Sequence, residues 1–490
     1  MTTQTRAATD VRDVKMIIGG EQVDAAEGMT FDVTNPATGE VIARAPLAGP
    51  VDVDRAVRAA RAAFEGPWST WSASKRGRAL LKYANLVKDH VEELAQLESA
   101  NVGKPITGAR GEAFSVSLVF EYYAGAANKH FGETIPVSKA GLDFTLREPV
   151  GVCGLIVPWN FPMNMASWKL GPALAAGNTT ILKPASYTPL TAIRLGVLAL
   201  EAGFPAGVVN ILTGPGGTAG AALAAHPGVD KIAFTGETAT GQEILRLAAG
   251  NIKKVSLELG GKSPNIVFAD ADLERFAAES PYAVFDNAGQ DCTARSRIFV
   301  QDAVHDRALE MFTRATQKVV VGDPADEKTE MGSLVSLRQR ERVLDYIGIG
   351  SAQGAELVYG GEPPSGEPFD RGAFLSPTIF DGASTEMRIV REEIFGPVVA
   401  VIPFTDEADA VRLANDTPYG LSGSIWTRDL AKALRVAKGV RAGVLSINSN
   451  SSVHTEAPFG GYKMSGLGRE LGMHALELYT ETKNVFVDLT

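Results

Sequence analysis

The sequence predicts an α/β protein whose first large unit is a doubly wound, Rossmann-type sheet and whose second unit is again α/β. Five short apolar segments alternate with helical patterns between residues 152 and 257, as in parallel sheets that are buried on both faces. The alternation restarts after Gly261. A chain of 490 residues exceeds the size at which one hydrophobic core keeps growing, so two or three domains are expected.

The N-terminal region combines turns with helices. Residues 15–46 contain short β-like segments separated by turn signals, which predicts surface hairpins. Apolar residues at three- and four-residue spacing then predict three helices, over residues 52–64, 74–97 and 109–127. Asp52 and Ser74 are the expected N-caps of the first two helices.

The five apolar segments are the expected parallel strands. They cover residues 152–157, 179–182, 208–212, 231–235 and 254–257, with helices starting near Met163, Thr188, Thr218 and Thr238. In such sheets ligands bind at the carboxyl ends of the strands, where helix N-termini offer unpaired N–H groups to anions. Unusual residues follow every strand, at 158–162, 183–186, 213–220, 236–241 and 258–261. This rim is therefore the expected binding site.

Two further stretches have an extended pattern. Residues 134–150 contain Pro136 and Gly141, which favour a hairpin arm over a core strand, and residues 483–489 alternate as a strand. An arm of this kind predicts contact with a second subunit, and hence a homodimer or homotetramer. A local surface hairpin is the alternative.

Composition argues against several classes of partner. A net charge of −10 offers no basic face to nucleic acid or to an anionic membrane, and no run of about 18 apolar residues predicts a membrane span.

Two cysteines in so long a chain predict a reducing, cytoplasmic location, and the first residues lack the apolar segment of a secretory signal. The histidines show no metal-binding spacing, so no metal is expected.

Residues 287–293, with the sequence NAGQDCT, contain the candidate nucleophile, Cys292. The segment is more polar than a strand or helix that merely buries a cysteine, and Gly289 permits a sharp backbone course. Free cysteine is more often a small buried hydrophobe. The segment alone therefore leaves both interpretations open.

Eight motifs follow one another along the chain. They are PWNFP (158–162), WKLGPALAAGN (168–178), KPASYTP (183–189), FTGETATG (234–241), LELGGKSPNIV (257–267), NAGQDC (287–292), EEIFGPV (392–398) and PFGGYKMSGLGRELG (458–472). With them the chain resembles the NAD(P)-dependent aldehyde dehydrogenases over nearly its whole length. The resemblance implies an aldehyde dehydrogenase-like fold with an NAD(P)-binding domain from residues 1–130 and 151–261, a catalytic domain from residues 262–463, and β oligomerisation segments at 131–150 and 464–490.

The resemblance also implies oxidation of an aldehyde to the carboxylate through a covalent thioester. Cys292 attacks the carbonyl as a thiolate, and the resulting thiohemiacetal becomes a thioester when it loses hydride. Asn160 and the backbone N–H of Cys292 stabilise the oxyanion, and Glu258 activates the water that hydrolyses the thioester. Lys169 and Glu470 are expected to relay protons, with a merely solvated pair as the alternative.

The same resemblance assigns the cofactor contacts to Trp159, Lys183, Ser186, Gly216, Gly236, Glu237, Gln339, Glu393 and Phe395. Ser186 stands where NAD-preferring members usually have a glutamate, and this removes a carboxylate that would repel a 2′-phosphate. Both NAD and NADP are therefore expected to be used. Glu237 stands where many members have a serine, and it is expected to point away from the pyrophosphate or to contact another group.

Matching positions place a largely apolar set around the aldehyde, namely Phe161, Met165, Trp168, Asp291, Thr293 and Phe459. An aliphatic or amino aldehyde is expected, because NAGQDCT is similar to the aminobutyraldehyde and betaine-aldehyde branches. Asp291 and Glu456 are candidates for attracting an amino group, and a hydrogen-bonded backbone anchor is the equally weighted alternative for Asp291. A semialdehyde-specific or CoA-acylating enzyme is the alternative, and Glu258 disfavours acylation by CoA. A protein that keeps the fold without activity has no reason to keep Cys292, Glu258 and Asn160 together.

Overall fold

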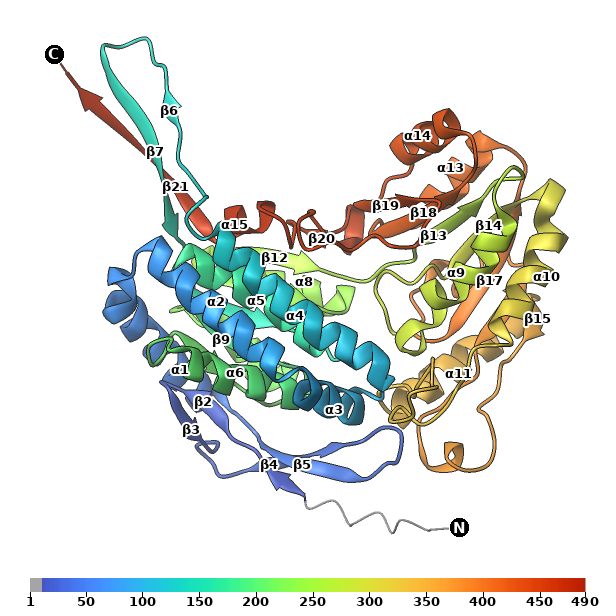
Figure 1. Ribbon diagram of the computed structural model, residues 1–490, viewed down its shortest axis with the longest axis horizontal. Coiled ribbons are helices and arrows are strands. Elements are labelled where there is room, and N and C mark those ends of the chain that lie inside the picture. Colours follow the sequence, from blue (N-terminus) through green and yellow to red (C-terminus); the bar gives the residue numbers. More distant parts are fainter. Residues whose placement is uncertain (1–10, 490) are drawn as a thin grey trace.

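Two large sheets dominate the computed structural model, which describes residues 11–489. The first sheet contains, in spatial order, β20 (Gly466–Leu467), β12 (Lys254–Glu258), β11 (Lys231–Thr235), β8 (Val152–Ile156), β9 (Thr179–Lys183), β10 (Val209–Ile211), β2 (Met16–Ile18) and β3 (Glu21–Val23). The second contains β15 (Glu356–Tyr359), β16 (Thr378–Asp381), β17 (Val398–Phe404), β14 (Arg297–Gln301), β13 (Pro264–Val267), β18 (Ser422–Trp426) and β19 (Val444–Ile447). The two sheets occupy separate halves of the molecule (Figure 1).

The five predicted parallel strands are confirmed as β8 to β12, each with bounds within a residue of the prediction. The helices that follow them are α5 (Pro162–Ala176), α6 (Leu190–Ala202), α7 (Ala221–Ala225) and α8 (Thr238–Ala248). A single π-helical turn, Gly216–Gly220, precedes α7. The hairpin of β2 and β3 is more than a surface feature, because β2 is buried and pairs with β10 as an antiparallel strand.

The N-terminal helices differ from the prediction in number and in their caps. They are α1 (Pro50–Glu65), α2 (Ala73–Asp89), α3 (Val91–Val102) and α4 (Ile106–Ala126). The single helix predicted over residues 74–97 is wrong, because the backbone leaves helical geometry at His90, whose ring lies 2.8 Å from the carbonyl oxygen of Leu86. The N-cap positions belong to Gly49 and Ser72, and Asp52 lies inside α1, where its carboxylate accepts the N–H of Gly49.

Helices cover both faces of the first sheet. Side chains of α2, α4, α5 and α6 form one core against it, and those of α1, α7 and α8 form another. The second sheet has a core of its own, with α9 (Leu273–Phe285), α10 (His305–Thr316), α11 (Leu337–Ala352), α12 (Arg388–Arg391), α13 (Glu407–Asn415) and α14 (Leu430–Gly439) in that half. Across residues 11–489, no helix has both the length and the apolar character needed to cross a membrane.

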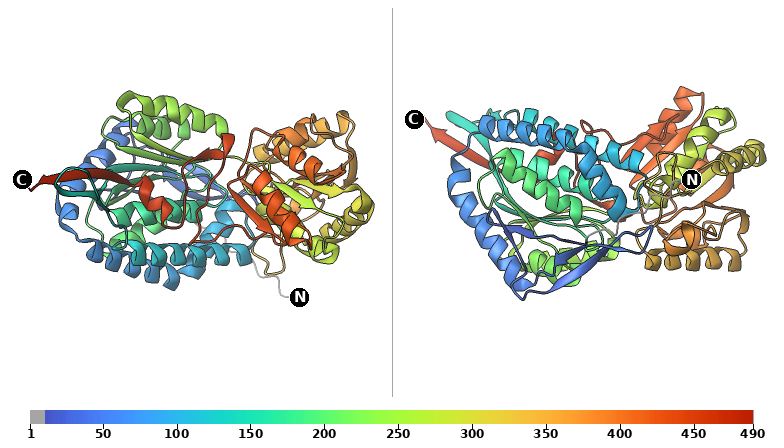
Figure 2. Two further views of the ribbon diagram at one scale, coloured as in Figure 1. Left: turned by 90° about the horizontal axis from the view of Figure 1, so that it is seen from above. Right: turned by 60° about the horizontal axis from the view of Figure 1, so that its bottom comes forward.

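A three-stranded sheet extends away from both halves (Figures 1 and 2). It is built from β6 (Thr134–Ile135), β7 (Gly141–Pro149) and β21 (Thr480–Asp488), in the order β21-β7-β6. β7 and β21 pair along their whole length. The extended pattern predicted for residues 134–150 and 483–489 thus corresponds to strands of one sheet. A second small sheet near the N-terminus contains β1 (Arg12–Asp13), β5 (Val41–Pro46) and β4 (Thr30–Thr34).

A buried ionic cluster joins α3 and α4 to the start of α5. Lys104 binds Glu112 in a short ion pair and lies 3.7 Å from Glu98, and all three side chains are at most 3% exposed. Glu112 also accepts the N–H of Asn164 at 3.1 Å. The lysine ammonium lies 4.1 Å from the centre of the Phe161 ring. The cluster therefore fixes the loop and helix that follow β8.

Removing the cation from this cluster should destabilise the fold. Lys104→Met leaves two carboxylates buried without their partner, so we expect a loss of about 3–5 kcal/mol in the free energy of unfolding. The shift in the urea midpoint, converted with the measured m-value, tests this. The double variant Lys104→Met/Glu112→Gln should regain part of the loss. Equal stability of wild type and Lys104→Met would contradict the ionic role.

Candidate active site

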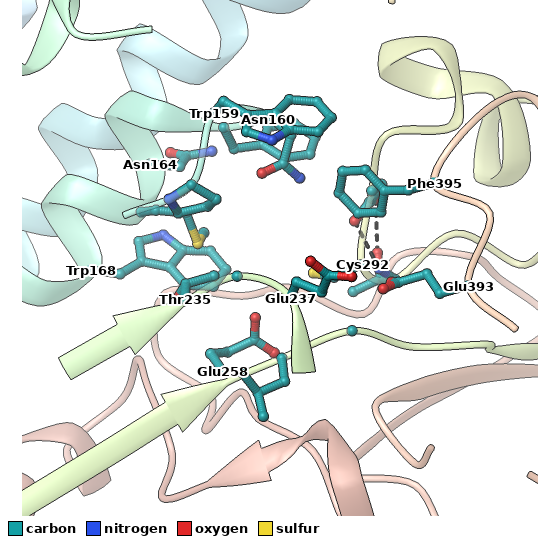
Figure 3. A pocket seen from close by; sticks show the side chains of 18 of the residues that line it. Trp159, Asn160, Asn164, Trp168, Thr235, Glu237, Glu258, Cys292, Glu393 and Phe395 are labelled. Atoms are coloured by element: carbon teal, nitrogen blue, oxygen red, sulfur yellow. Dashed lines mark hydrogen bonds between the residues drawn. The ribbon is translucent and has the colours of Figure 1, made fainter. Parts of the chain in front are cut away.

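A cavity of about 350 Å³ opens at the carboxyl ends of β8, β11 and β12. Its walls come from the loop after β8, the first turns of α5, the cysteine segment, α11, and the segment that contains Glu393 and Phe395. Both halves of the molecule thus contribute residues. Figure 3 shows the Asn160 amide, the Cys292 sulfur and the Glu258 carboxylate projecting into this space from different sides.

Most of the predicted site residues meet in this cavity. They are Trp159, Asn160, Phe161, Met165, Trp168, Gly236, Glu237, Glu258, Asp291, Cys292, Thr293, Gln339, Glu393, Phe395 and Phe459. Five others lie outside its wall, namely Lys169, Lys183, Ser186, Gly216 and Glu470. Lys169 and Glu470 lie behind the cavity, and the other three lie at the ends of β9 and β10.

The segment before Cys292 has an unusual backbone. Asn287, Ala288 and Gly289 are all left-handed, with φ of 50°, 56° and 69°, although only glycine adopts this region without cost. A Cβ on Gly289 would lie 2.2 Å from the carbonyl oxygen of Gly396, so a larger residue cannot fit. The segment therefore turns sharply, as the glycine predicted, and packs directly against a neighbouring loop.

Two side-chain amides hold the cysteine segment against the loop after β8. Asn287 donates to the carbonyl oxygen of Asn160 at 2.9 Å, and Asn160 donates to that of Gln290 at 2.8 Å. Gln290 in turn accepts the N–H of Val335 at 2.8 Å. Asn160 is 4% exposed, and its amide keeps a second N–H for another acceptor. In the described part of the chain, no hydrogen bond engages the backbone N–H of Cys292.

The Cys292 thiol lies in a buried, acidic environment. Burial raises the pKa of this thiol well above its usual range. Neighbouring carboxylates raise it further, chiefly those of Glu258, Asp291 and Glu393. Because both effects disfavour the thiolate, Cys292 needs a base to take its proton at neutral pH.

Asp291 makes local hydrogen bonds. Its two carboxylate oxygens accept the backbone N–H and the hydroxyl of Thr293, at 2.8 and 2.9 Å. This arrangement is the backbone anchor that the sequence left open as one of two interpretations. Glu456, the other acidic residue considered for an amino group, is exposed and is absent from the cavity wall.

Glu258 is a buried carboxylate without a partner. It is 2% exposed, and within the described residues neither of its oxygens makes a hydrogen bond. Burial raises its pKa well above the ordinary range, and Glu470 adds to this, while Lys169 lowers it. A raised pKa makes this carboxylate a stronger base than an ordinary glutamate, as general-base catalysis requires.

A buried polar chain lies behind Glu258. Thr235 is its register partner on β11, and Lys169 donates to the Thr235 hydroxyl at 2.6 Å. Lys169 also binds Glu470 at 2.5 Å, and the lysine is fully buried. The alternative of a merely solvated charge pair is therefore wrong, because a buried pair of this kind needs a structural or chemical reason.

The cofactor side of the cavity has the features that a dinucleotide requires. Gly216 and Gly217 are exposed, and a Cβ on either would meet only open space, so a pyrophosphate can approach the backbone there. Further along, the N-terminus of α8 has no side-chain cap and leaves its N–H groups free. Lys183 is 2% exposed and donates to the carbonyl oxygen of Pro184 at 2.9 Å, and burial lowers its pKa to about 8.

Glu393 and Phe395 form the opposite end of this side. Glu393 accepts the N–H of Gly261 at 2.9 Å, and burial raises its pKa to about 7. The rings of Trp159 and Phe395 meet edge-on with their centres 5.1 Å apart, and Gln339 donates to the Phe395 carbonyl oxygen at 2.8 Å. A carboxylate acceptor beside an aromatic pair suits a ribose and its attached base.

Glu237 faces a cation. Arg342 lies 4.0 Å from its carboxylate, and both side chains are exposed. The expectation that Glu237 contacts another group is thus met by a residue that sequence reasoning missed. Asn164 and Asp286 also line the cavity and were missed. Asn164 lies four residues after Asn160, and Asp286 lies one residue before Asn287, so their closeness to recognised motifs could have identified both. Arg342 belongs to α11, outside any motif, and nothing in the sequence indicated its position.

The comparisons with known proteins agree with this site. The model of the aldehyde dehydrogenase family matches residues 23–485. The chain is 46% identical to betaine aldehyde dehydrogenase of Bacillus subtilis, over 96% of each protein. Its structure resembles the NAD+ complex of an aldehyde dehydrogenase from Bacillus cereus, with a TM-score of 0.96 and 46% identity over 98% of this chain and 97% of that one. It also resembles betaine aldehyde dehydrogenase from Staphylococcus aureus with NAD+, with a TM-score of 0.95 and 40% identity over 97% and 94% of the two chains.

The fold and the cavity therefore define an oxidoreductase with a nicotinamide cofactor. The chain belongs to the aldehyde dehydrogenase family, as its sequence motifs predicted. It is an enzyme that oxidises aldehydes with NAD+.

The environment of Cys292 predicts an unusual response to pH. Because its pKa is raised, the thiolate fraction should still grow above about pH 9.5, where that of an ordinary cysteine has nearly levelled off. The rate of alkylation by iodoacetamide, measured on enzyme without NAD+ or aldehyde, should rise from about pH 7 to about pH 10 without a plateau. Cys153 is fully buried with a pKa raised to about 12, so Cys292→Ser should stay unlabelled. A plateau reached at or below about pH 9.5 would contradict the raised pKa.

Proposed function

We propose that Cys292, Glu258 and Asn160 are the catalytic residues, acting in turn as nucleophile, general base and oxyanion donor. The supporting observation is their convergence on one cavity, where Glu258 has two unpartnered buried oxygens. The sharp turn before Cys292 and the amide contacts of Asn160 hold nucleophile and donor together before the substrate arrives. Such preorganisation lowers the cost of reaching the transition state.

In the first half of the reaction, Glu258 takes the proton of the Cys292 thiol, directly or through a water molecule. The thiolate attacks the aldehyde carbon and forms a tetrahedral thiohemiacetal. Its oxyanion accepts hydrogen bonds from the Asn160 amide and the Cys292 backbone N–H. When bound, NAD+ supplies the acceptor for the hydride that leaves the tetrahedral carbon. The carbonyl then re-forms as a thioester on Cys292.

In the second half, Glu258 first gives up the proton that it took from the thiol. It then takes a proton from water, and the resulting hydroxide attacks the thioester carbon. The C–S bond breaks, the carboxylic acid is released, and Cys292 returns as a thiolate. Thr235, the register partner of Glu258, contacts the Lys169–Glu470 pair through its hydroxyl, so the proton would leave Glu258 in that direction through a water molecule. A CoA-acylating enzyme would not need Glu258 as a base for water, so this alternative is not favoured.

Substitution of the base should impair both halves of the reaction. Glu258→Gln should lower the steady-state kcat by about 10²–10⁴-fold, because the thiol and the water both lose their base. With NAD+ and aldehyde, the thioester that does form on Cys292 should persist, visible by mass spectrometry of quenched enzyme. Cys292→Ser is the matched control and should show neither turnover nor adduct. Full NADH production by Cys292→Ser would overturn the mechanism.

We infer that the enzyme uses both NAD+ and NADP+. Ser186 follows the end of β9, is partly exposed, and brings no carboxylate to the region of Lys183. Glu237, the acidic residue nearer the pyrophosphate site, is balanced by Arg342. A 2′-phosphate therefore meets a lysine and no opposing carboxylate at this position.

Restoring a carboxylate should change the cofactor preference. Ser186→Glu should lower kcat/KM for NADP+ by at least about tenfold through charge repulsion and leave NAD+ nearly unchanged. Initial rates with both cofactors and one good aldehyde measure this, with Ser186→Gln as the uncharged control. Dual use is refuted if wild-type kcat/KM with NADP+ is less than about a thousandth of that with NAD+, a gap of roughly 4 kcal/mol.

We further propose an aliphatic or amino aldehyde as substrate, of the kind named for the betaine aldehyde dehydrogenases among the relatives. The apolar wall supports this, since Trp168 and Phe459 meet edge-on with ring centres 5.1 Å apart beside Phe161 and Met165. A semialdehyde-specific enzyme would need a cation for the second carboxylate. Arg342, which is near Glu237, is the sole lysine or arginine among the described residues of the wall.

We also propose the domain and subunit arrangement expected from sequence. The first and second sheets correspond to the cofactor-binding and catalytic domains, with the arm as the oligomerisation element of a homodimer or homotetramer. In support, the arm exposes apolar side chains of Ile135, Leu142, Leu146, Phe486 and Val487, which a second subunit would cover. A cytoplasmic location stays a prediction and is compatible with two unpaired cysteines.

A further inference from the structure

The cavity wall is strongly acidic. Its charged members, within the described residues, are the carboxylates Glu237, Glu258, Asp286, Asp291 and Glu393 and the single guanidinium of Arg342. The mechanism and the local geometry account for four of the acids. Glu237 lies near Arg342, Glu258 is the base, Asp291 is bonded to Thr293, and Glu393 accepts the N–H of Gly261. Asp286 remains without a role.

Asp286 occupies the point where α9 ends and the cysteine segment begins. One of its oxygens accepts the N–H of Asn287 at 2.9 Å, and in residues 11–489 no lysine, arginine or histidine lies within 4.0 Å of its carboxylate. Lys104 is the cation that acts on it, but that ammonium is bound by Glu112 and flanked by Glu98. The cluster already holds more carboxylates than cations, so Asp286 is not neutralised by the protein.

The electrostatic environment of Asp286 also favours a bound cation. Its side chain is reachable from the cavity, yet the surrounding protein raises its pKa through burial, and Asp291 adds to this. A cation placed beside the carboxylate would reverse both effects. Aromatic rings lie in the same cavity wall, those of Phe161, Trp168 and Phe459, and ring faces attract alkylammonium groups.

We propose that Asp286 is the specificity-determining residue for aldehydes with a cationic nitrogen at the far end of the carbon chain. The aldehyde carbon meets Cys292, while the ammonium or trimethylammonium group lies between the Asp286 carboxylate and the aromatic wall. This assignment rests on the proposed function of Cys292. It replaces Asp291 and Glu456 in the role that the sequence suggested for them.

A matched pair of substrates tests this proposal. 4-(Trimethylammonio)butanal and 5,5-dimethylhexanal have the same shape and differ in one nitrogen and its charge. Asp286→Asn should lower kcat/KM for the charged aldehyde by about 10- to 100-fold, the range of an interaction with a charged group. For the uncharged aldehyde, kcat/KM should change by less than about twofold, which also shows that the variant is folded and chemically competent.

Two control variants separate a local contact from overall charge. Glu121→Gln removes an exposed carboxylate from α4 and should leave the preference for the charged aldehyde unchanged. Asp286→Glu keeps the charge and should retain part of that preference. Equal losses for both aldehydes in Asp286→Asn, or no loss for either, would overturn the assignment of Asp286. Failure of the wild-type enzyme to oxidise either aldehyde, or full activity of Cys292→Ser, would instead remove the proposed function and the inference with it.

Discussion

The active site depends on the pair of amide contacts that join the two halves of the molecule. Asn160 follows a strand of the first sheet, whereas Asn287 and Gln290 belong to the segment that leads into the second. Each asparagine donates to a backbone oxygen of the other segment. Buried amides cost free energy unless they are paired, so this arrangement admits one relative position of the two segments. The same two hydrogen bonds therefore fix the position of Cys292, the nucleophile, relative to Asn160, the oxyanion donor.

The unpaired carboxylate of the site has a different role from the paired charges around it. Lys104, Glu98 and Glu112 form a buried cluster that stabilises the packing of helices, and Lys169 binds Glu470. Glu258 has no such partner, and burial raises its pKa. The protein thus pairs the buried charges that hold its helices together and leaves a carboxylate unpaired where protons must move.

Much of the fold followed from the sequence because its signals were local. Short apolar segments predicted all five parallel strands of the first sheet, and the residues after them predicted most of the cavity wall. The break at His90 was not visible, since the helical spacing continues across it. Arg342 and the hydrogen bonds of Asp291 were equally hidden, because they depend on packing between segments that are distant in the chain. Asp286 was missed for another reason: it lies one residue before a recognised motif.

The course of the chain from Phe459 to the end of β21 links parts of the enzyme that are usually considered separately. Phe459 lines the cavity, β20 extends the sheet beside the strand that ends in Glu258, Glu470 binds Lys169, and β21 completes the projecting arm. These parts are consecutive, so a truncation that removes one of them also removes all that follow it. A shortened chain that lacks only β21 would expose the long edge of β7 to other strands. Tags and fusions are therefore better placed ahead of β1, because its sheet with β4 and β5 lies apart from the arm in Figure 1.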